Sequence, residues 1–261
     1  MPACYAVIIP ACNEEPCLGS VLAGLEAVLD SSRFVICVGV NGSTDRTAEI
    51  ARAAGVLVGE TAERGYGHGC IAAIEHFESR CEPPLGYIFF AADGANDARD
   101  IAALVTEHEE GAELVLGART LLRENRETMQ WQHVLANRLL AFWCMMLTGK
   151  RFSDLGSLRL IDRALFHRLG LREWTMGWTI EAQVRAAMLG ARIREVPVRE
   201  HARIAGEQKV SRVSWSRTLR IGCEIVAAGW RTRFPGSAEK PLPVRPANCG
   251  ERRAVNGPYR R

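Results

Sequence analysis

Three short polar segments of this chain each follow directly after a run of apolar residues. They are PACNEE at 10–15, NGSTD at 41–45 and ADGAND at 92–97. Carboxylates and amides of this kind bind divalent cations, phosphate oxygens and hydroxyl groups. If the apolar runs are neighbouring parallel strands, the three segments meet at one edge of a sheet, which is where such sheets bind ligands.

The spacing alone leaves the role of the individual residues open. Asp93 either binds a divalent cation or begins a turn with Gly94. Asn13 and Glu14 either line a ligand pocket or cap the next helix. Asp45 is more typical of a helix start than of a ligand.

A fourth segment, RGYGHG at 64–69, combines a basic residue with three glycines before a predicted helix. Bare backbone at a helix N-terminus can approach a diphosphate or a ribose. The segment is not the dinucleotide-binding fingerprint G-x-G-x-x-G, because Cys70 occupies the third glycine position. A tight turn is the alternative interpretation.

The elements that position these segments follow from alternating apolar and helical patterns. Five apolar runs predict buried strands at 4–9, 34–40, 56–60, 85–92 and 112–117. Helices are predicted between them at 17–29, 44–54, 70–78 and 97–109. Strands that alternate with helices in this way predict an α/β fold, with a mainly parallel sheet and helices on both faces.

The alternation is looser after residue 117. The pattern predicts a polar loop at 119–130, helices at 131–147, 178–189 and 214–231, and strands at 157–161 and 191–198. Five prolines and an excess of basic residues after position 233 predict a disordered tail. We therefore divide the chain into one domain, 1–232, and a basic, proline-rich tail, 233–261.

The composition excludes several classes of protein. The chain has 261 residues, of which 48% are hydrophobic and 24% charged, and this is typical of a globular protein. Residues 231–261 contain eight Lys and Arg against two Glu, so a charge of +6 lies there while the whole chain carries +3. The preceding body is therefore mildly acidic, and we expect no binding of nucleic acid.

The cysteines and the apolar runs bear on location. The nine cysteines are odd in number, lack CxxC spacing and mostly lie in apolar runs, which is typical of reduced core cysteines in a cytoplasmic protein. We expect no signal peptide and no spanning helix, because the longest apolar run has nine residues and a span needs about 20. The basic tail leaves peripheral contact with the inner face of the membrane open.

Seven segments, in order, resemble those of the family 2 glycosyltransferases, in the branch similar to dolichyl-phosphate mannose synthase. The first is VIIPACNEE at 7–15, which is similar to VIIPAYNEE of that family. The others are VNGSTDRTAEIA (40–51), RGYGHGCIAAI (64–74), FFAADGANDARDI (89–101), SDLGSLRLIDRALFHRLGLRE (153–173), GWTIEAQVRAAMLGARIREVPV (177–198) and HARIAGEQKVS (201–211). The resemblance spans residues 4–231.

This resemblance implies a GT-A fold, with a nucleotide-sugar-binding half at 1–116 and an acceptor half at 117–232. It implies transfer of a sugar from a nucleoside-diphosphate sugar to an acceptor, with inversion and with help from Mg²⁺ or Mn²⁺. The implied metal ligand is Asp93. The implied donor-binding residues are Pro10, Asn13, Glu14, Asn41, Ser43, Arg64, Gly65, Gly67 and Asp93.

The later segments imply the catalytic and acceptor-side residues. Glu181 and Asp154 match family carboxylates near the acceptor, and Glu181 is the candidate general base. A surface helix position and a helix cap are their alternatives. The basic residues expected to bind the diphosphate or an anionic acceptor are Arg159, Arg203 and Lys209. A polyprenyl phosphate and other phosphates are both candidates for such an acceptor.

Two departures from the family pattern bear on activity. Ala91 stands where the family has the first Asp of its DxD element, and Val40 stands where an Asp precedes NGS. Losing one carboxylate weakens metal binding, although substrate phosphates supply other ligands and Asn96 or Asp97 are candidates to compensate. These departures keep open a second interpretation, in which the chain is a degenerate, non-catalytic relative that binds a nucleotide sugar or a protein partner.

Overall fold

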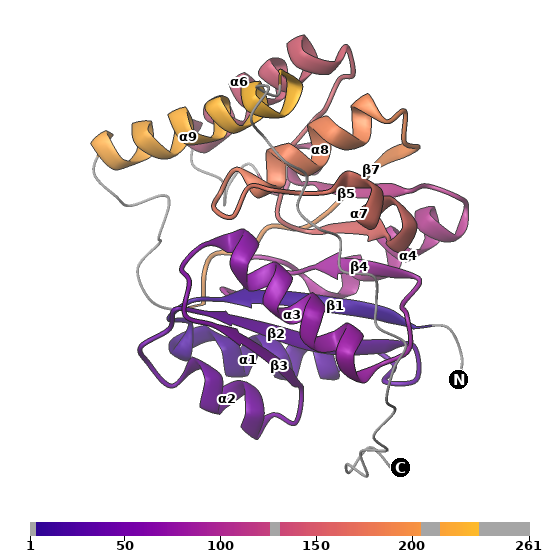
Figure 1. Cartoon of the computed structure of the whole chain (residues 1–261), viewed down its shortest axis with the longest axis vertical. Coiled ribbons are helices and arrows are strands. Elements are labelled where there is room, and N and C mark those ends of the chain that lie inside the picture. Colours follow the sequence, from indigo (N-terminus) through magenta and orange to yellow (C-terminus); the bar gives the residue numbers. More distant parts are fainter. Residues whose placement is uncertain (1–3, 126–130, 205–214, 235–261) are drawn as a thin grey trace.

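The structure is a computed structural model that describes residues 4–125, 131–204 and 215–234. Its centre is a seven-stranded sheet with the order β3-β2-β1-β4-β6-β5-β7 (Figure 1). The strands are β1 (Tyr5–Ala11), β2 (Phe34–Asn41), β3 (Leu57–Thr61), β4 (Gly86–Phe89), β5 (Leu114–Ala118), β6 (Arg159–Asp162) and β7 (Ile193–Pro197). Only β6 runs antiparallel to its neighbours among these strands, so the predicted mainly parallel sheet is confirmed.

Helices cover both faces of the sheet, as the alternating pattern predicts. One face packs against α1 (Glu15–Glu26), α2 (Thr47–Ala53) and α4 (Ile101–Glu109). The other packs against α3 (Tyr66–Arg80), α6 (Trp131–Thr148), α7 (Arg163–Leu169), α8 (Trp178–Met188) and α9 (Trp215–Arg233). Two short 3-10 helices, η1 (Ala98–Asp100) and η2 (Arg119–Leu121), follow β4 and β5.

The central position of β1 in the sheet explains why its sequence is almost wholly apolar. Ala6 and Ile8 of β1 belong to one core cluster, whereas Tyr5, Val7 and Ile9 belong to the cluster on the opposite face. Because side chains alternate across a strand, a strand covered on both faces needs apolar residues at every position. The continuous apolar run at 4–9 therefore indicates a strand in the middle of the sheet.

The structure departs from the predicted elements in two places. α3 begins at Tyr66, inside the segment predicted as a glycine-rich turn, and α7 is a helix that the pattern did not predict. Each fits a local cause. α3 packs closely against β2 there, since a Cβ on Gly39 would lie only 1.9 Å from the carbonyl oxygen of Gly69. The side chain of Asp162 caps α7 by accepting from the backbone N–H of Leu165.

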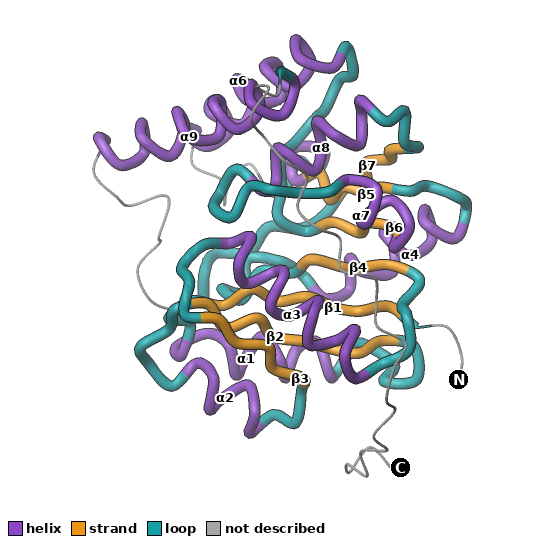
Figure 2. The backbone as a smooth tube through the Cα atoms, viewed as in Figure 1, coloured by secondary structure: helices purple, strands orange, loops and turns teal. Residues whose placement is uncertain are grey.

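The carboxyl ends of β1, β2 and β4 lie at one edge of the sheet, because these strands are parallel neighbours. In Figure 2 the strands β1 and β2 run toward the left side of the view, where the loops that follow them gather. The predicted convergence of the polar segments is thus confirmed. In the part of the chain that the structure describes, no helix combines the length and apolarity needed to cross a bilayer. Lys209 and most of the tail, 235–261, lie outside the described residues.

Candidate active site

The loops that follow β1 and β2 hold each other by hydrogen bonds. Asn13 accepts at its Oδ1 from the backbone N–H of Thr44 (2.8 Å), and its own N–H donates to Oγ of Ser43 (3.0 Å). Asn13 adopts a left-handed backbone conformation with φ of 52°, which Asn tolerates better than most residues. Two residues expected to bind the donor therefore also fix the shape of the edge.

Asn41 joins the end of β2 to the glycine-rich segment. It is buried, and its side-chain N–H donates to the carbonyl of Gly65 (3.0 Å). A Cβ on Gly69 would lie 2.8 Å from Oδ1 of Asn41 and 2.9 Å from Cβ of Pro10. Arg64 donates through Nε to the carbonyl of Gly42 (3.1 Å). The structure thus brings together the predicted residues of β1, β2 and the glycine-rich segment.

The glycines of that segment are also needed for packing against a distant loop. A Cβ on Gly65 would lie 2.3 Å from the carbonyl oxygen of Trp174, and one on Gly67 would lie 2.6 Å from that of Glu173. The backbone N–H groups of Gly67 and His68 both donate to the Trp174 carbonyl. This packing accounts for glycine at both positions, and their contact with a donor stays a prediction.

Three predicted residues from distant parts of the chain meet at the end of β4. Asp93 has a side chain that is 31% exposed, and NH1 of Arg203 lies 3.5 Å from its Oδ2. Arg203 also forms an ion pair with Glu14, which follows β1. The N–H of Ile204 donates to the carbonyl of Asp93 (3.2 Å). The edge therefore holds two carboxylates and one guanidinium in contact.

The side chains near Asp93 decide how a divalent cation would fit. Ala91 contributes no carboxylate, and its N–H donates to Oδ1 of Asn96 (2.9 Å). Asp97 accepts from Arg99 and from His201, and the Arg99 hydrogen bond chiefly holds the pKa of Asp97 far below its usual range. The described residues contain no group of three or more His, Cys, Asp or Glu that could hold a metal. The side chains near Asp93 are compatible with a cation that Asp93 binds together with the phosphates of a substrate, as Mg²⁺ is commonly bound.

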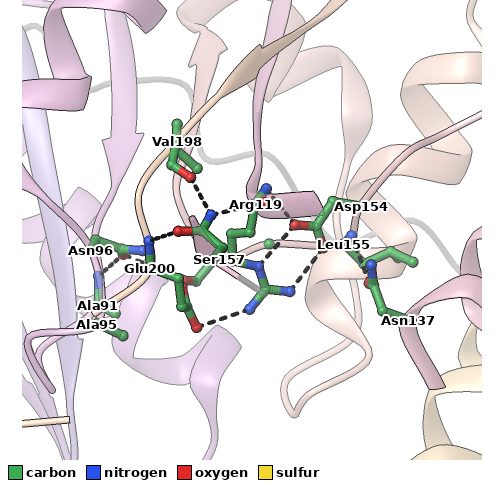
Figure 3. A network of polar contacts seen from close by, with 12 residues as sticks. Ala91, Ala95, Asn96, Arg119, Asn137, Asp154, Leu155, Ser157, Val198 and Glu200 are labelled. Atoms are coloured by element: carbon green, nitrogen blue, oxygen red, sulfur yellow. Dashed lines mark hydrogen bonds and ion pairs between the residues drawn. The ribbon is translucent and has the colours of Figure 1, made fainter. Parts of the chain in front are cut away.

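A second polar network lies beside this edge and includes Asp154 (Figure 3). Asp154 is 1% exposed and accepts three hydrogen bonds from Arg119, one from its backbone N–H (2.7 Å) and two from its guanidinium (both 2.8 Å). Arg119 also approaches Glu200 at 3.3 Å. Burial raises the pKa of Glu200, whereas Arg119 acts against that rise. Glu200 also forms a β-bridge with Asn96, three residues after Asp93, so the network adjoins the Asp93 edge.

The sequence motifs pointed to Asp154 but to neither Arg119 nor Glu200. Arg119 follows β5 directly and Glu200 follows β7 by three residues, so their places at strand ends were the available signal. Because both oxygens of Asp154 are bound by Arg119, the geometry makes Asp154 a positioning residue for that arginine. Its catalytic role stays a prediction.

Arg159 lies inside the protein rather than at the edge. Its side chain has no exposed surface and donates to the carbonyl groups of Thr179 (3.0 Å) and Gly156. Burial lowers the pKa of Arg159. In this conformation Arg159 presents no accessible face to a phosphate, and it ties the segment before β6 to the start of α8.

Glu181 also differs from the place expected of a general base. It is 1% exposed, and its carboxylate accepts from the backbone N–H groups of Arg172 (2.8 Å) and Glu173 (2.7 Å). Arg185 donates to its other oxygen (2.8 Å). Glu181 thereby fastens the loop that packs on Gly65 and Gly67, and it lines a cavity of about 310 Å³. In the structure Glu181 therefore holds this loop in place, and its role as a general base stays a prediction.

Comparisons with known proteins agree on one family. The model of Glycosyl transferase family 2 matches residues 6–174. A dolichyl-phosphate hexose transferase of Haloferax volcanii is 34% identical over 216 residues, which cover 78% of this chain and 86% of that protein. An uncharacterized glycosyltransferase of Mycobacterium tuberculosis is 31% identical over 207 residues, 78% of this chain and 88% of that protein.

A solved structure shows the same fold. Glucosyl-3-phosphoglycerate synthase of Mycobacterium tuberculosis, in complex with UDP, superposes with a TM-score of 0.61 at 18% identity. The match covers 90% of this chain and 82% of that chain. The complex of the same enzyme with Mn²⁺, UDP-glucose and glycerol 3-phosphate gives a TM-score of 0.59. The sheet, the polar edge and these matches together show that this chain belongs to the family 2 glycosyltransferases and has the GT-A fold.

Proposed function

We propose that this glycosyltransferase moves a sugar from a nucleoside-diphosphate sugar to a phosphate acceptor by an inverting displacement assisted by Mg²⁺ or Mn²⁺. The observation that carries the proposal is the contact of Asp93 with Arg203, which is itself paired with Glu14. These groups come from three distant segments and meet at the ligand-binding edge of the sheet. The solved structure of glucosyl-3-phosphoglycerate synthase holds Mn²⁺, UDP-glucose and glycerol 3-phosphate, so UDP-sugars are the first donors to test.

We assign a separate role to each of the polar residues at this edge of the sheet. Asp93 holds the cation together with the phosphates of the donor, and the cation, when bound, neutralises charge on the leaving diphosphate. Arg203 provides a forked cation that can exchange its carboxylate partners for a diphosphate. Asn13 and Ser43 keep the loops beside them in shape.

The proposed binding of the acceptor depends on the polar network around Arg119. This guanidinium is held in place by Asp154 and lies next to Glu200, which forms a β-bridge with Asn96, three residues after Asp93. A fixed cation there would orient an anionic acceptor, for which a polyprenyl phosphate and a small phosphate are both suited. The Haloferax volcanii relative named for dolichyl phosphate supports the lipid-linked choice. An ionised phosphate needs no general base, which fits the anchoring contacts of Glu181.

We also propose that the protein acts in the cytoplasm, at the inner face of the membrane if the acceptor is lipid-linked. All eight cysteines among the described residues are free thiols, and most of them are at least half-buried. A reducing compartment preserves such thiols, which supports this location.

The test is thermal unfolding of the chain with UDP-, GDP- and TDP-sugars, each with and without Mn²⁺. We expect one donor to raise Tm in a metal-dependent way, and we expect Asp93→Asn to abolish the metal-dependent part of the shift. The matched control is Glu82→Gln, which changes an exposed carboxylate to an amide and should behave as the unaltered chain does.

A turnover assay with the donor so identified then separates catalysis from binding. Release of the nucleoside diphosphate in the presence of polyprenyl phosphate or glycerol 3-phosphate would support the proposal and name the acceptor class. A folded chain that shows no donor-dependent shift and no release would instead be the degenerate relative that Ala91 and Val40 suggest.

A further inference from the structure

The loop that carries Asp154 is held by side chains rather than by regular structure. Residues 153–156 lie between α6 and β6 and form neither a helix nor a strand. Backbone N–H and C=O groups inside a protein need hydrogen-bond partners, which other backbone groups supply in helices and strands. In this loop, side chains from distant elements supply them. We call residues 153–156 the Asp154 loop.

Two buried amide side chains bind one peptide group of the Asp154 loop from two helices. Asn137 of α6 accepts at Oδ1 from the backbone N–H of Leu155 (3.0 Å). Gln183 of α8 donates through Nε2 to the carbonyl of Asp154, at the longer distance of 3.4 Å. This carbonyl and this N–H belong to the same peptide group, and the two amides are only 6% and 0% exposed. The peptide group is therefore fixed between α6 and α8.

Side chains from three further elements hold the two ends of the Asp154 loop. Thr120 of η2 donates to the carbonyl of Ser153 (2.9 Å), and Glu195 of β7 accepts from the N–H of Ser153 (2.8 Å). Arg159 of β6 donates to the carbonyl of Gly156. The backbone of this short loop is thus bound by side chains from η2, α6, β6, α8 and β7, which is how a protein fixes a loop in one conformation.

The fixed backbone determines where the carboxylate of Asp154 lies. Both of its oxygens accept from the guanidinium of Arg119, each at 2.8 Å. Figure 3 shows Arg119 and Asn137 on opposite sides of Asp154. The side chain of Arg119 is 20% exposed, whereas that of Asp154 is not exposed at all. An accessible guanidinium is therefore held by a carboxylate that cannot move, and less conformational entropy is lost when an anion binds it.

The two amides carry a cost that packing alone does not explain. Nδ2 of Asn137 and Oε1 of Gln183 are buried and have no hydrogen-bond partner among the described residues. A polar atom buried without a partner costs free energy, and an apolar side chain of the same shape avoids that cost. Within the described part of the chain, each amide uses only the atom that contacts the Asp154 loop. This favours a task in holding the loop.

We propose that Asn137 and Gln183 are positioning residues for the acceptor, because they hold the Asp154 loop so that Arg119 presents its guanidinium to an anionic acceptor in one orientation. The inference rests on the proposed function, which makes the acceptor a phosphate. A loosened loop should weaken the binding of the acceptor. It should leave the binding of the donor, which we assign to the Asp93 edge, nearly unchanged.

The test uses Asn137→Leu and Gln183→Met, which replace each amide by an apolar side chain of similar size. Turnover is measured with the donor found by thermal unfolding and with glycerol 3-phosphate or a polyprenyl phosphate. We expect the acceptor KM to rise about tenfold in Asn137→Leu and about threefold in Gln183→Met, whose hydrogen bond is longer. The donor KM should change by less than about twofold, since the donor does not meet the loop.

The matched control is Thr232→Val, which removes a buried hydroxyl that donates to the carbonyl of Ala228 in α9. It should leave both KM values unchanged. Thermal unfolding checks that every variant folds. If Asn137→Leu does not fold, Gln183→Met decides the question, because it removes an unpaired oxygen together with a long hydrogen bond and should change Tm little.

Hydrogen exchange tests the hold on the loop without any substrate. The N–H of Leu155 should exchange about tenfold faster in Asn137→Leu than in the unaltered chain, while exchange in β1 stays the same. Unchanged exchange at Leu155, or folded variants in which only the donor KM changes or no KM changes, would overturn the positioning role and leave the proposed function standing. An unaltered chain that uses no phosphate acceptor would overturn both, and this result is distinct because it requires no variant.

Discussion

At the level of single residues, the candidate site has one carboxylate fewer than the family pattern, and an arginine contacts the carboxylate that remains. Where the family pattern has two Asp, this chain has Ala91 and Asp93, and Arg203 contacts Asp93 and pairs with Glu14. A guanidinium in this position already neutralises part of the negative charge at the edge. A bound metal would therefore compete with Arg203 for Asp93, which leads us to expect weak metal binding in the absence of donor.

Asp97 shows how one carboxylate can control the acid stability of this edge. Its side chain is 6% exposed and pairs with Arg99 and His201. The Arg99 hydrogen bond is the main reason that its folded-state pKa lies below the unfolded-state value of about 3.9. The stability from Asp97 is thus present above about pH 4 and is lost as the pH falls through the folded-state pKa.

We therefore expect Asp97→Asn to lower the free energy of unfolding at pH 7 by about 2 kcal/mol, an effect that solvent screening of the exposed Arg99 partly reduces. Between pH 7 and pH 3 the stability of the variant should fall less steeply than that of the unaltered chain. Urea unfolding across this range measures both, with Glu82→Gln as the control. Parallel pH profiles for the variant and the unaltered chain would contradict the argument.

At the level of elements, close packing between β2 and α3 dictates glycine at defined positions. A Cβ on Gly39 would lie 1.9 Å from the carbonyl oxygen of Gly69, so any side chain there pushes the helix off the sheet. Gly24, in contrast, sits exposed in α1, and a Cβ there meets no atom within 4 Å. The same substitution at these two positions should have opposite signs.

We expect Gly39→Ala to destabilise the fold by about 3 kcal/mol, because the overlap involves backbone that cannot turn away. Gly24→Ala should stabilise it by about 0.5–1 kcal/mol, because alanine is the better helix former. Thermal or urea unfolding of the two variants and of the unaltered chain measures both changes in the free energy of unfolding. A small effect at Gly39 would mean that α3 sits farther from β2 than the structure places it.

The same elements show how much the sequence could predict. The strands β1, β4 and β5 were predictable because they are buried along almost their whole length and so leave continuous apolar runs, whereas the partly exposed β7 leaves an alternating pattern. α7 was missed because seven residues give too little periodicity, although Asp162 as its cap was a usable signal. The pairing of Arg119 with Asp154 and Glu200 joins residues 35 and 81 positions apart, which no local pattern reveals. The inward direction of Glu181 and Arg159 likewise depends on long-range packing.

At the level of the whole molecule, we expect donor and acceptor binding to be divided along the sheet. Strands β1, β2 and β4 precede the loops proposed to bind the donor, and β6, from the proposed acceptor half, runs antiparallel to β4. The segment after β7 then returns to the Asp93 edge through Arg203 and Ile204. Both proposed halves therefore contribute residues to the candidate site.

The division into a domain and a basic tail leads to a prediction for the whole chain. Residues 235–261 carry six Lys and Arg against two Glu, a net charge of +4. A chain that ends at Phe234 should unfold at an unchanged Tm if the folded domain is complete without the tail. It should bind anionic vesicles more than tenfold more weakly, since each basic residue near an anionic surface contributes about 1 kcal/mol.

The difference should vanish in high salt and with neutral vesicles, because it comes from charge alone. Binding that survives truncation unchanged would mean that the folded domain, rather than the tail, meets the anionic surface. A large fall in Tm after truncation would instead mean that the tail packs on the domain, and the predicted boundary near residue 232 would then be wrong.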